Sequence, residues 1–375
     1  MIDVIKRYED GVDLIRMTTA SIDMTVSNLG GHILSLLYKD SLGIWETVVL
    51  GYEEVHDCRE DGACLCAICG RVANRIGDGK FELNGKSYQL ATNSGPHHLH
   101  GGEHGFDEKV FDYEIIHGDL TVSEDCAKSK DHSTPGDCSA GEKLIFTYRS
   151  ADGEEGYPGN LDTTITYHLE DNRLFIDFEY ESDQDTIVNL TNHMYFNLSG
   201  NQPETSAFKN KIYGHELLID ADEMTLVDET GLAYGPKMKV AGTPFDFNDF
   251  HVIGERIDAD HEQIKNASGY DQAFMLNRSI KVGQSLEGAS PQAVLMDPES
   301  GRCVNIFTSY PAIQIYTSNF LSGGVNGHHG KPYEDRDGIA IETQYMSNSI
   351  QIEDEPKVIL KSGEHRHEQT VFEFM

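Results

Sequence analysis

Apolar and polar residues alternate with a period of two through much of this sequence. In RLFIDFEYES (173–182), every second residue from Leu174 to Tyr180 is apolar, which is the pattern of a β-strand with one buried face. KFELNGKSYQL (80–90) places Asn-Gly between two strand-like runs, the strongest short-range signal for a β-hairpin. AVLMDPESGRCVNIFTSY (293–310) repeats the arrangement with a longer turn. The chain therefore predicts many strands joined by turns.

Helical patterning is scarce. Only FHVIGERIDADHEQI (250–264) could form a short helix or two. The 36 glycines supply turn positions, and the sequence shows no repeat of fixed period and no proline- or serine-rich linker. A chain of 375 residues fits one β domain, because sandwiches and barrels often exceed the roughly 150 residues of an average domain. We expect one all-β domain over residues 1–375, with a few short helices.

One segment departs from this pattern. DLTVSEDCAKSKDHSTPGDCSAGEK (119–143) is polar and rich in turn-forming residues, while strand-like stretches lie on both sides of it. We expect a surface insertion within the domain. Cys126 and Cys138 could pair across this loop under oxidation.

Acidic residues outnumber basic residues by 63 to 29, which gives a formal net charge of −34. Such a surface repels phosphate backbones and anionic lipid headgroups, so we expect neither nucleic-acid nor membrane partners. No stretch approaches the roughly 18 apolar residues that span a bilayer, and the N-terminus lacks the apolar region of a signal peptide. Seven cysteines without an export signal indicate reduced thiols and a cytoplasmic protein.

Four of these cysteines lie close together in CREDGACLCAIC (58–69). Zinc sites usually pair two C-x-x-C motifs or add a histidine pair, and neither pattern is complete here. Cys64 and Cys66 alternate within the apolar run ACLCAIC, which resembles a buried strand. We expect Cys58, Cys64, Cys66 and Cys69 to be buried structural thiols, with a metal site as the alternative.

Polar clusters occur inside or just beyond apolar β segments at five places. A charged group in such a setting is costly unless it is paired. Taken singly, each cluster could be a set of satisfied polar groups at a strand end. Together they fit a β scaffold that gathers side chains from several strands into one cleft. The clusters are GRVANRI (70–76), GPHHLHGG (95–102), TNHMYFNL (191–198), GYDQAF (269–274) and AIETQY (340–345).

The order of these motifs resembles the aldose 1-epimerase family, also called galactose mutarotases. EEGYPGNL (154–161) and IQIYTSNFL (313–321) belong to the same series, and the similarity runs from about Asn28 to the C-terminus. The LHGG and TNHMYFNL blocks are the most specific. The resemblance implies a single large β-sandwich of the galactose mutarotase type. Its sugar cleft would be open to water and would need neither cofactor nor metal.

The resemblance also assigns roles to individual residues. His193, in TNHMYFNL, matches the general acid, and Glu342, in IETQ, matches the general base. His100 and Arg75 match residues that bind sugar hydroxyls and help to orient the acid. Further substrate-binding positions are the carboxylate of Asp271, the amide of Gln314 and, as a weaker candidate, Asn74.

These residue types suit the reaction on chemical grounds. Interconversion of the anomers of a pyranose requires a base at the anomeric hydroxyl and an acid at the ring oxygen. Ordinary pKa values of roughly 4.3 for Glu and 6.5 for His make a workable pair near neutral pH without a metal. Tyr195 or Phe196 could offer an apolar face to the sugar.

Two positions depart from the family pattern, and two other functions remain open. Gln272 stands where family members often have His, and YMSN (345–348) replaces the family's Pro-Asp pair. The partner expected is a small aldose such as galactose or glucose, bound by a monomer or homodimer. The alternatives are a hexose-6-phosphate 1-epimerase, which would need cations around the phosphate, and a non-catalytic sugar-binding protein.

Overall fold

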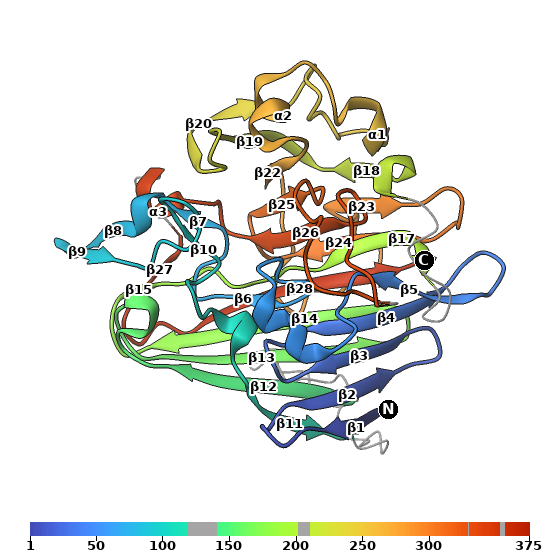
Figure 1. Cartoon of the computed structure of the whole chain (residues 1–375), viewed down its shortest axis with the longest axis horizontal. Coiled ribbons are helices and arrows are strands. Elements are labelled where there is room, and N and C mark those ends of the chain that lie inside the picture. The colour runs from blue at the N-terminus through green and yellow to red at the C-terminus, as the bar shows by residue number, and fades with distance from the viewer. Residues whose placement is uncertain (119–140, 202–210, 329, 353–356) are drawn as a thin grey trace, which may run out of the picture.

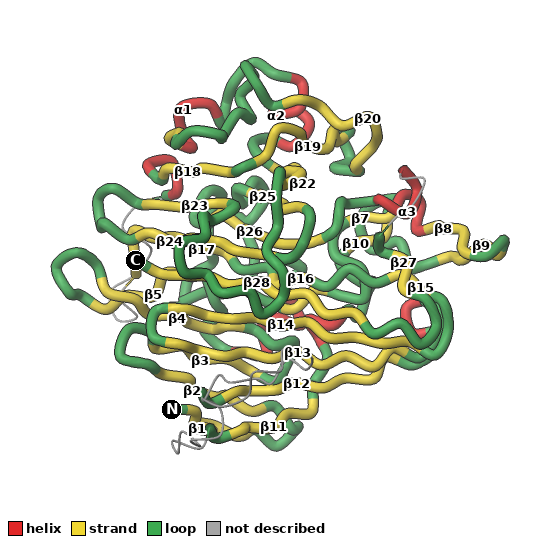
Figure 2. The backbone as a smooth tube through the Cα atoms, turned by 180° about the vertical axis from the view of Figure 1, so that it is seen from behind, coloured by secondary structure: helices red, strands yellow, loops and turns green. Residues whose placement is uncertain are grey.

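Two large β-sheets dominate the computed structural model, which describes residues 1–118, 141–201, 211–328, 330–352 and 357–375. Strands account for 46% of the structure and helices for 9%, and Figure 2 shows how few helical turns interrupt the strands. The expected all-β fold with a few short helices is therefore confirmed.

The first sheet has eleven strands and runs across the whole molecule (Figure 1). Its strands, in spatial order, are β1 (Ile2–Arg7), β2 (Asp13–Thr18), β3 (Asp23–Ser27), β4 (Ile33–Lys39), β5 (Trp45–Val49), β17 (Tyr195–Asn201), β26 (Ile339–Gln344), β25 (Ala312–Tyr316), β22 (Asp271–Leu276), β19 (Ala221–Val227) and β20 (Ala233–Lys239).

The second sheet has nine strands. In spatial order they are β11 (Asp112–Ile116), β12 (Lys143–Ser150), β13 (Leu161–Glu170), β14 (Arg173–Ser182), β28 (Arg366–Phe374), β24 (Cys303–Thr308), β23 (Ala293–Met296), β18 (Glu216–Ile219) and β21 (His251–Val252).

Short elements connect and cover the sheets. The two-stranded pairs are β7 (Arg75–Ile76) with β10 (His98–Leu99), β16 (Thr191–Asn192) with β6 (Ile68–Cys69), β15 (Thr186–Ile187) with β27 (Ile359–Leu360), and β8 (Lys80–Leu83) with β9 (Lys86–Gln89). The α-helices are α1 (Ile253–Arg256), α2 (Glu262–Ala267) and α3 (Ser349–Ile352). Single 3-10 turns are η1 (Val55–Glu60), η2 (Gly77–Gly79), η3 (Phe106–Glu108), η4 (Glu154–Gly156) and η5 (Ile212–Gly214).

Aromatic side chains join the inner faces of the two sheets. Phe196 of β17 packs on Phe372 and Phe374 of β28, with ring centroids 5.4 and 6.4 Å apart. Tyr38 of β4 reaches Phe374 in the same way, at 5.5 Å. The hydrophobic effect therefore holds the sheets face to face, since each buried aromatic ring removes a large apolar area from water.

Several local predictions are confirmed. The alternating residues of β14 from Leu174 to Tyr180 are buried, and their neighbours are more exposed. The extra aromatic of that strand, Phe175, lies on the outer face and packs against a small cluster of Ile280, Phe307 and Val371. The Asn-Gly hairpin forms as β8–β9, the longer hairpin forms as β23–β24, and α1 and α2 arise in the one helical stretch.

The predicted strand through ACLCAIC is wrong for most of its length. Only Ile68–Cys69 forms a strand, because Cys64 and Cys66 have φ angles of 51° and 53° in the left-handed region. Turns at these two residues prevent a regular ladder. Burial was predicted correctly: Cys58, Cys64, Cys66 and Cys69 are all buried free thiols.

Two further expectations concern the polar insertion and membrane-spanning helices. Residues 119–140 of the polar insertion, with Cys126 and Cys138, lie outside the described residues. Among the residues that are described, no helix has the length and apolar character needed to cross a membrane.

Candidate active site

A cleft of about 480 Å³ opens above the central strands of the eleven-stranded sheet. Its size falls within the roughly 300–1,000 Å³ that is usual for small-molecule sites. Six of the seven residues singled out in the sequence line it: Asn74, Arg75, His100, His193, Asp271 and Glu342. The seventh, Gln314, is not among the lining residues but is hydrogen-bonded to Asp271.

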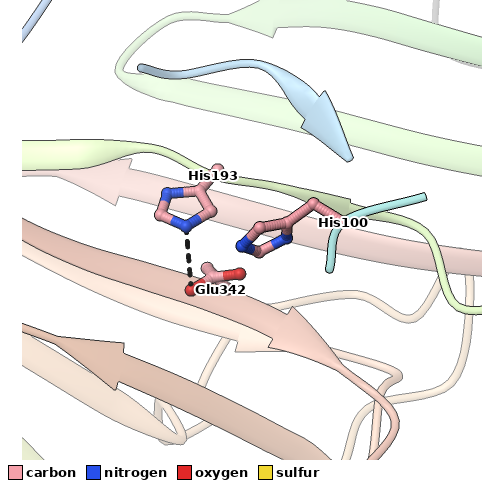
Figure 3. Close-up of side chains that lie close together, drawn as sticks. All are labelled: His100, His193 and Glu342. Atoms are coloured by element: carbon pink, nitrogen blue, oxygen red, sulfur yellow. Dashed lines mark ion pairs between the residues drawn. The ribbon is translucent and has the colours of Figure 1, made fainter. Parts of the chain in front are cut away.

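Strand register brings His193 and Glu342 together. β17 pairs with β26 so that Tyr195 faces Ala340, and continuing this antiparallel register by two residues places His193 opposite Glu342. The side chains meet there, with His193 Nε2 3.3 Å from Glu342 Oε1 (Figure 3). Both are almost fully buried, at 4% and 1% exposure.

The next strands extend this row of polar side chains. In the pairing of β25 with β26, Gln314 faces Glu342. The Gln314 amide Nε2 donates to Asp271 Oδ1 at 2.6 Å, and Asp271 begins β22, the following strand. Opposite and diagonal residues on one sheet face lie close enough for such contacts. Histidine, glutamate, glutamine and aspartate therefore share one face of four neighbouring segments.

A small ribbon, β7–β10, supplies the opposite wall. Leu99 pairs with Arg75, and the N–H of His100 donates to the Asn74 carbonyl at 3.2 Å. The Gly101 that follows is required, because its φ is +100° and a Cβ there would lie 1.8 Å from the Gly70 oxygen. The LHGG motif thus allows a close backbone crossing that carries His100 over the cleft.

Backbone contacts fix the orientation of His193. Its N–H donates to the Ala67 carbonyl at 2.8 Å, and its carbonyl accepts from the N–H of Cys66 at 3.0 Å. The Tyr195 ring stacks on the imidazole at 4.8 Å, and its hydroxyl donates to the Ala63 carbonyl at 3.0 Å. Tyr195 therefore borders the cleft, as expected, whereas Phe196 lies in the inter-sheet core and does not face the sugar site.

Burial shifts the pKa values of both members of the pair toward their neutral forms. It lowers the pKa of His193 to about 4. It raises the pKa of Glu342 well above the usual carboxyl range; the nearby Asp271 raises that pKa further and Arg75 opposes the shift. The pKa of Asp271 is also raised, chiefly by burial, although Arg75 and the Gln314 amide lower it. Water is largely excluded from the groups at the floor of the cleft.

Several polar atoms of the cleft residues have no hydrogen-bond partner within the described structure. These atoms are His193 Nδ1, Glu342 Oε2 and Arg75 Nε. Buried polar atoms usually find partners, and unpaired ones cluster where a ligand or water is to be bound. A polyhydroxylated molecule would supply both donors and acceptors to such atoms.

The two departures from the family pattern lie outside the cleft lining. Gln272 is fully buried; its amide donates to the Gln263 carbonyl at 3.1 Å and its side-chain oxygen accepts from the Asp271 N–H at 2.8 Å. It links β22 to α2 rather than binding a ligand. In YMSN, the Ser347 hydroxyl donates to Gln314 Oε1 at 3.4 Å, so this segment supports the polar row from behind.

Other residues of the cleft were not predicted from the sequence. Tyr316 lies two residues after Gln314 on β25, so strand periodicity could have found it. Phe320 stands at the rim with 71% exposure. Asp61 and Glu229 come from loops, where no periodicity signals the direction of a side chain.

Known proteins resemble this chain over nearly its whole length. The model of the aldose 1-epimerase family matches residues 13–373. Galactose mutarotase from Sus scrofa is 36% identical over 363 residues, covering 97% of this chain and 94% of the relative. Aldose 1-epimerase from Escherichia coli is 31% identical over 359 residues, with coverage of 95% and 93%.

Solved structures show the same fold. An aldose epimerase homologue from C. elegans superposes with a TM-score of 0.80 at 26% identity, covering 97% of this chain and 99% of that one. Galactose 1-epimerase from Lactobacillus acidophilus gives 0.78 at 26% identity, with coverage of 100% and 98%. The chain belongs to the aldose 1-epimerase family.

Proposed function

We propose that this protein is an isomerase that interconverts the α and β anomers of free aldohexoses such as galactose and glucose. The contact of His193 Nε2 with Glu342 Oε1 at 3.3 Å on the cleft floor carries this proposal. The two oxygens that exchange protons in ring opening are both bonded to the anomeric carbon. A pair this close can therefore serve both oxygens of one sugar.

The reaction consists of proton transfers, opening of the ring, rotation about one bond and closure of the ring. Glu342 takes the proton from the anomeric hydroxyl while His193 delivers a proton to the ring oxygen. The bond between C1 and the ring oxygen breaks and a carbonyl forms at C1. Rotation about C1–C2 presents the other carbonyl face, and the transfers run in reverse to close the ring. Arg75, His100 and Asp271 would hold the remaining hydroxyls.

The acid and base share one transferable proton. Because the pKa of His193 is lowered to about 4 and that of Glu342 is raised well above its usual range, a single proton shared by the pair lies on the carboxyl side in the empty site. Neutral carboxyl with neutral imidazole has the same proton count as carboxylate with imidazolium. Conversion between the two forms is therefore independent of pH, and the pair titrates as a unit.

The polarimetric assay tests the proposal directly. The protein is expected to accelerate the relaxation of optical rotation after α-D-galactose or α-D-glucose is dissolved. Unchanged relaxation with both sugars, at protein concentrations that saturate any binding, would reject the activity.

The shared proton predicts the pH dependence of the reaction. As pH falls through about 4, His193 gains a proton while Glu342 is already protonated, so no base remains and the rate falls. As pH rises, activity is lost only when the pair gives up its last proton, at the raised pKa of Glu342. We expect the acid limb of kcat/KM to be centred near pH 4 and not near 6.5, the ordinary pKa of an imidazole. Polarimetry across this range, corrected for the uncatalysed rate, measures the profile. An acid limb centred near pH 6.5 would contradict the shared-proton model.

The cleft disfavours a phosphorylated sugar. Arg75 is the single Lys or Arg among its described lining residues, whereas four lining residues are carboxylic acids: Asp61, Glu229, Asp271 and Glu342. Juxtaposed like charges cost several kcal/mol. We expect kcat/KM for glucose 6-phosphate to be at least about tenfold below that for glucose, since tenfold corresponds to only about 1.4 kcal/mol. Equal values would favour the hexose-6-phosphate 1-epimerase alternative.

A purely sugar-binding function is less well supported. Burying an imidazole against a carboxylate is costly and unnecessary for binding neutral hydroxyls, which amides and hydroxyl groups bind as well. Saturable galactose binding in calorimetry without any acceleration of mutarotation would favour this function.

We also propose that the chain acts as one domain in the cytoplasm, as a monomer or homodimer. Free cysteines at five described positions suit a reducing compartment, and one hydrophobic cluster draws side chains from both sheets. Light scattering coupled to gel filtration would give the oligomeric state.

A further inference from the structure

The backbone of Asn74 holds the ring of His100. The N–H of Asn74 donates to His100 Nδ1 at 3.3 Å. An amide N–H can only donate, so Nδ1 must offer its lone pair. Burial, together with His193 and Arg75, lowers the pKa of His100 well below its usual value, so the ring is neutral near pH 7. A neutral imidazole that accepts at Nδ1 carries its proton on Nε2.

The protonated nitrogen is the one that faces the catalytic pair. Figure 3 shows one ring nitrogen of His100 turned toward the space beside His193 and Glu342, and the three side chains bring ligand-type atoms within 4.8 Å of one another. That spacing is compatible with a metal site. A nitrogen that already carries a proton has no lone pair for a metal ion. The Nε2–H of His100 therefore provides a hydrogen-bond donor in the cleft.

The conformation of Asn74 makes this contact possible. Its φ is 61°, in the left-handed region that Asn, Asp and Gly adopt more readily than other residues. Its side-chain Oδ1 accepts the N–H of Arg75 at 2.7 Å, a local bond that stabilises the turn. The oxygen that could have met the sugar is therefore committed to the backbone of the next residue.

We propose that Asn74 is a positioning residue, which holds His100 as the Nε2–H tautomer through its backbone N–H and braces Arg75 through its side-chain oxygen. His100 then presents a fixed donor to a sugar oxygen and cannot compete with Glu342 as a base. This role differs from the direct sugar binding expected of Asn74 from the sequence. The inference rests on the proposed function for its catalytic consequence, but the tautomer itself can be measured without any sugar.

Nitrogen NMR of the histidine side chains measures the tautomer. In the protein labelled with ¹⁵N-histidine and assigned with a His100→Gln variant, we expect His100 Nδ1 to resonate as an unprotonated acceptor and Nε2 as a protonated nitrogen. Asn74→Asp and Asn74→Gly should keep this signature because both residues tolerate a left-handed φ. Asn74→Ala should shift it toward the other tautomer, because its Cβ disfavours that φ and it lacks the Oδ1 bond.

Kinetics separates positioning from direct binding. Asn74→Asp keeps an oxygen for the Arg75 N–H but loses the amide donors, and we expect it to lose less kcat than Asn74→Ala. Asn74→Ala should lose about 10- to 100-fold in kcat with a smaller change in KM, comparable with the loss of one preorganised donor. Asn74→Gly should keep most of kcat and raise KM, since only the hydrogen bond from the Arg75 N–H to the Asn74 side chain is missing.

Three results would overturn the inference. One is a wild-type His100 protonated at Nδ1. Another is an Asn74→Ala variant with unchanged tautomer and kcat. The third is an Asn74→Asp variant as impaired as Asn74→Ala while its His100 signals stay unchanged, which would mean that the amide binds the sugar directly. The expected tautomer in a protein that accelerates no mutarotation would instead count against the proposed function alone.

Discussion

Replacing Glu342 with Gln, or His193 with Asn, is expected to lower kcat by about 10²- to 10⁴-fold, the usual contribution of a positioned acid or base. Each substitution keeps the approximate shape of the side chain but removes the group that exchanges protons with the sugar. Polarimetric initial rates with α-D-galactose measure the loss, and circular dichroism checks that the fold is intact. A matched control is His117→Asn, because that side chain is 66% exposed and pairs with Glu142.

The double variant provides a sharper test of the paired mechanism. Because both groups act in the same proton exchange, removing the second should cost little more than removing the first. If the two groups acted independently, the fold-losses in kcat of the two single variants would multiply in the double variant. Single variants that retain the wild-type rate would refute the assignment of acid and base.

Replacing Arg302 with Met is expected to lower the free energy of unfolding by about 3–5 kcal/mol, because it removes the cationic partner of the buried carboxylate of Glu46. Arg302 Nη2 lies 2.8 Å from Glu46 Oε2, and the two side chains are 1% and 0% exposed. The guanidinium also donates to the Leu198 carbonyl at 3.0 Å. It thus ties β17, which follows His193, to β5 and to the start of β24.

Urea denaturation of the wild-type protein and of the Arg302→Met variant measures this loss of unfolding free energy. Arg149→Met provides a matched control, since the Arg149–Asp162 pair is about 60% exposed on both sides and exposed pairs are worth only about 0–1 kcal/mol. Adding Glu46→Gln to Arg302→Met should recover part of the stability, because the buried negative charge is then absent. Equal losses of unfolding free energy in Arg302→Met and Arg149→Met would contradict a special contribution of the buried ion pair.

Much of the fold could be predicted because strand signals are local. The period-two pattern of β14 and the Asn-Gly turn of β8–β9 depend on residues within a few positions of each other. The error at ACLCAIC has a physical cause. Its apolar alternation reflects burial alone, while left-handed turns at Cys64 and Cys66 turn the backbone so that Cys66 can bind the backbone of His193.

The residues of the site could be predicted from sequence motifs, but the contacts between them could not. Those contacts depend on the order of the strands in the folded sheet. Gln314 was expected to bind the sugar; the structure shows its amide donating to Asp271 Oδ1 at 2.6 Å, a contact that no motif signalled. Arg71 stands beside the predicted residues in GRVANRI, yet it is buried and donates to the Pro158 and Ser150 carbonyls in and near EEGYPGNL. Two arginines of one motif thus have different tasks, one at the cleft and one in the scaffold.

Local sequence patterns are enough to predict that the chain builds strands rather than helices, and which polar residues stand at the ends of those strands. The contact between His193 and Glu342 depends on the assembled fold, because β17 and β26 are distant in the chain and become neighbours only when the eleven-stranded sheet forms. Side-chain alternation is set by adjacent peptide units, whereas the pairing of distant strands is set by the packing of the whole core. The pKa values of the pair have the same origin, since burial of those two groups exists only in the folded protein.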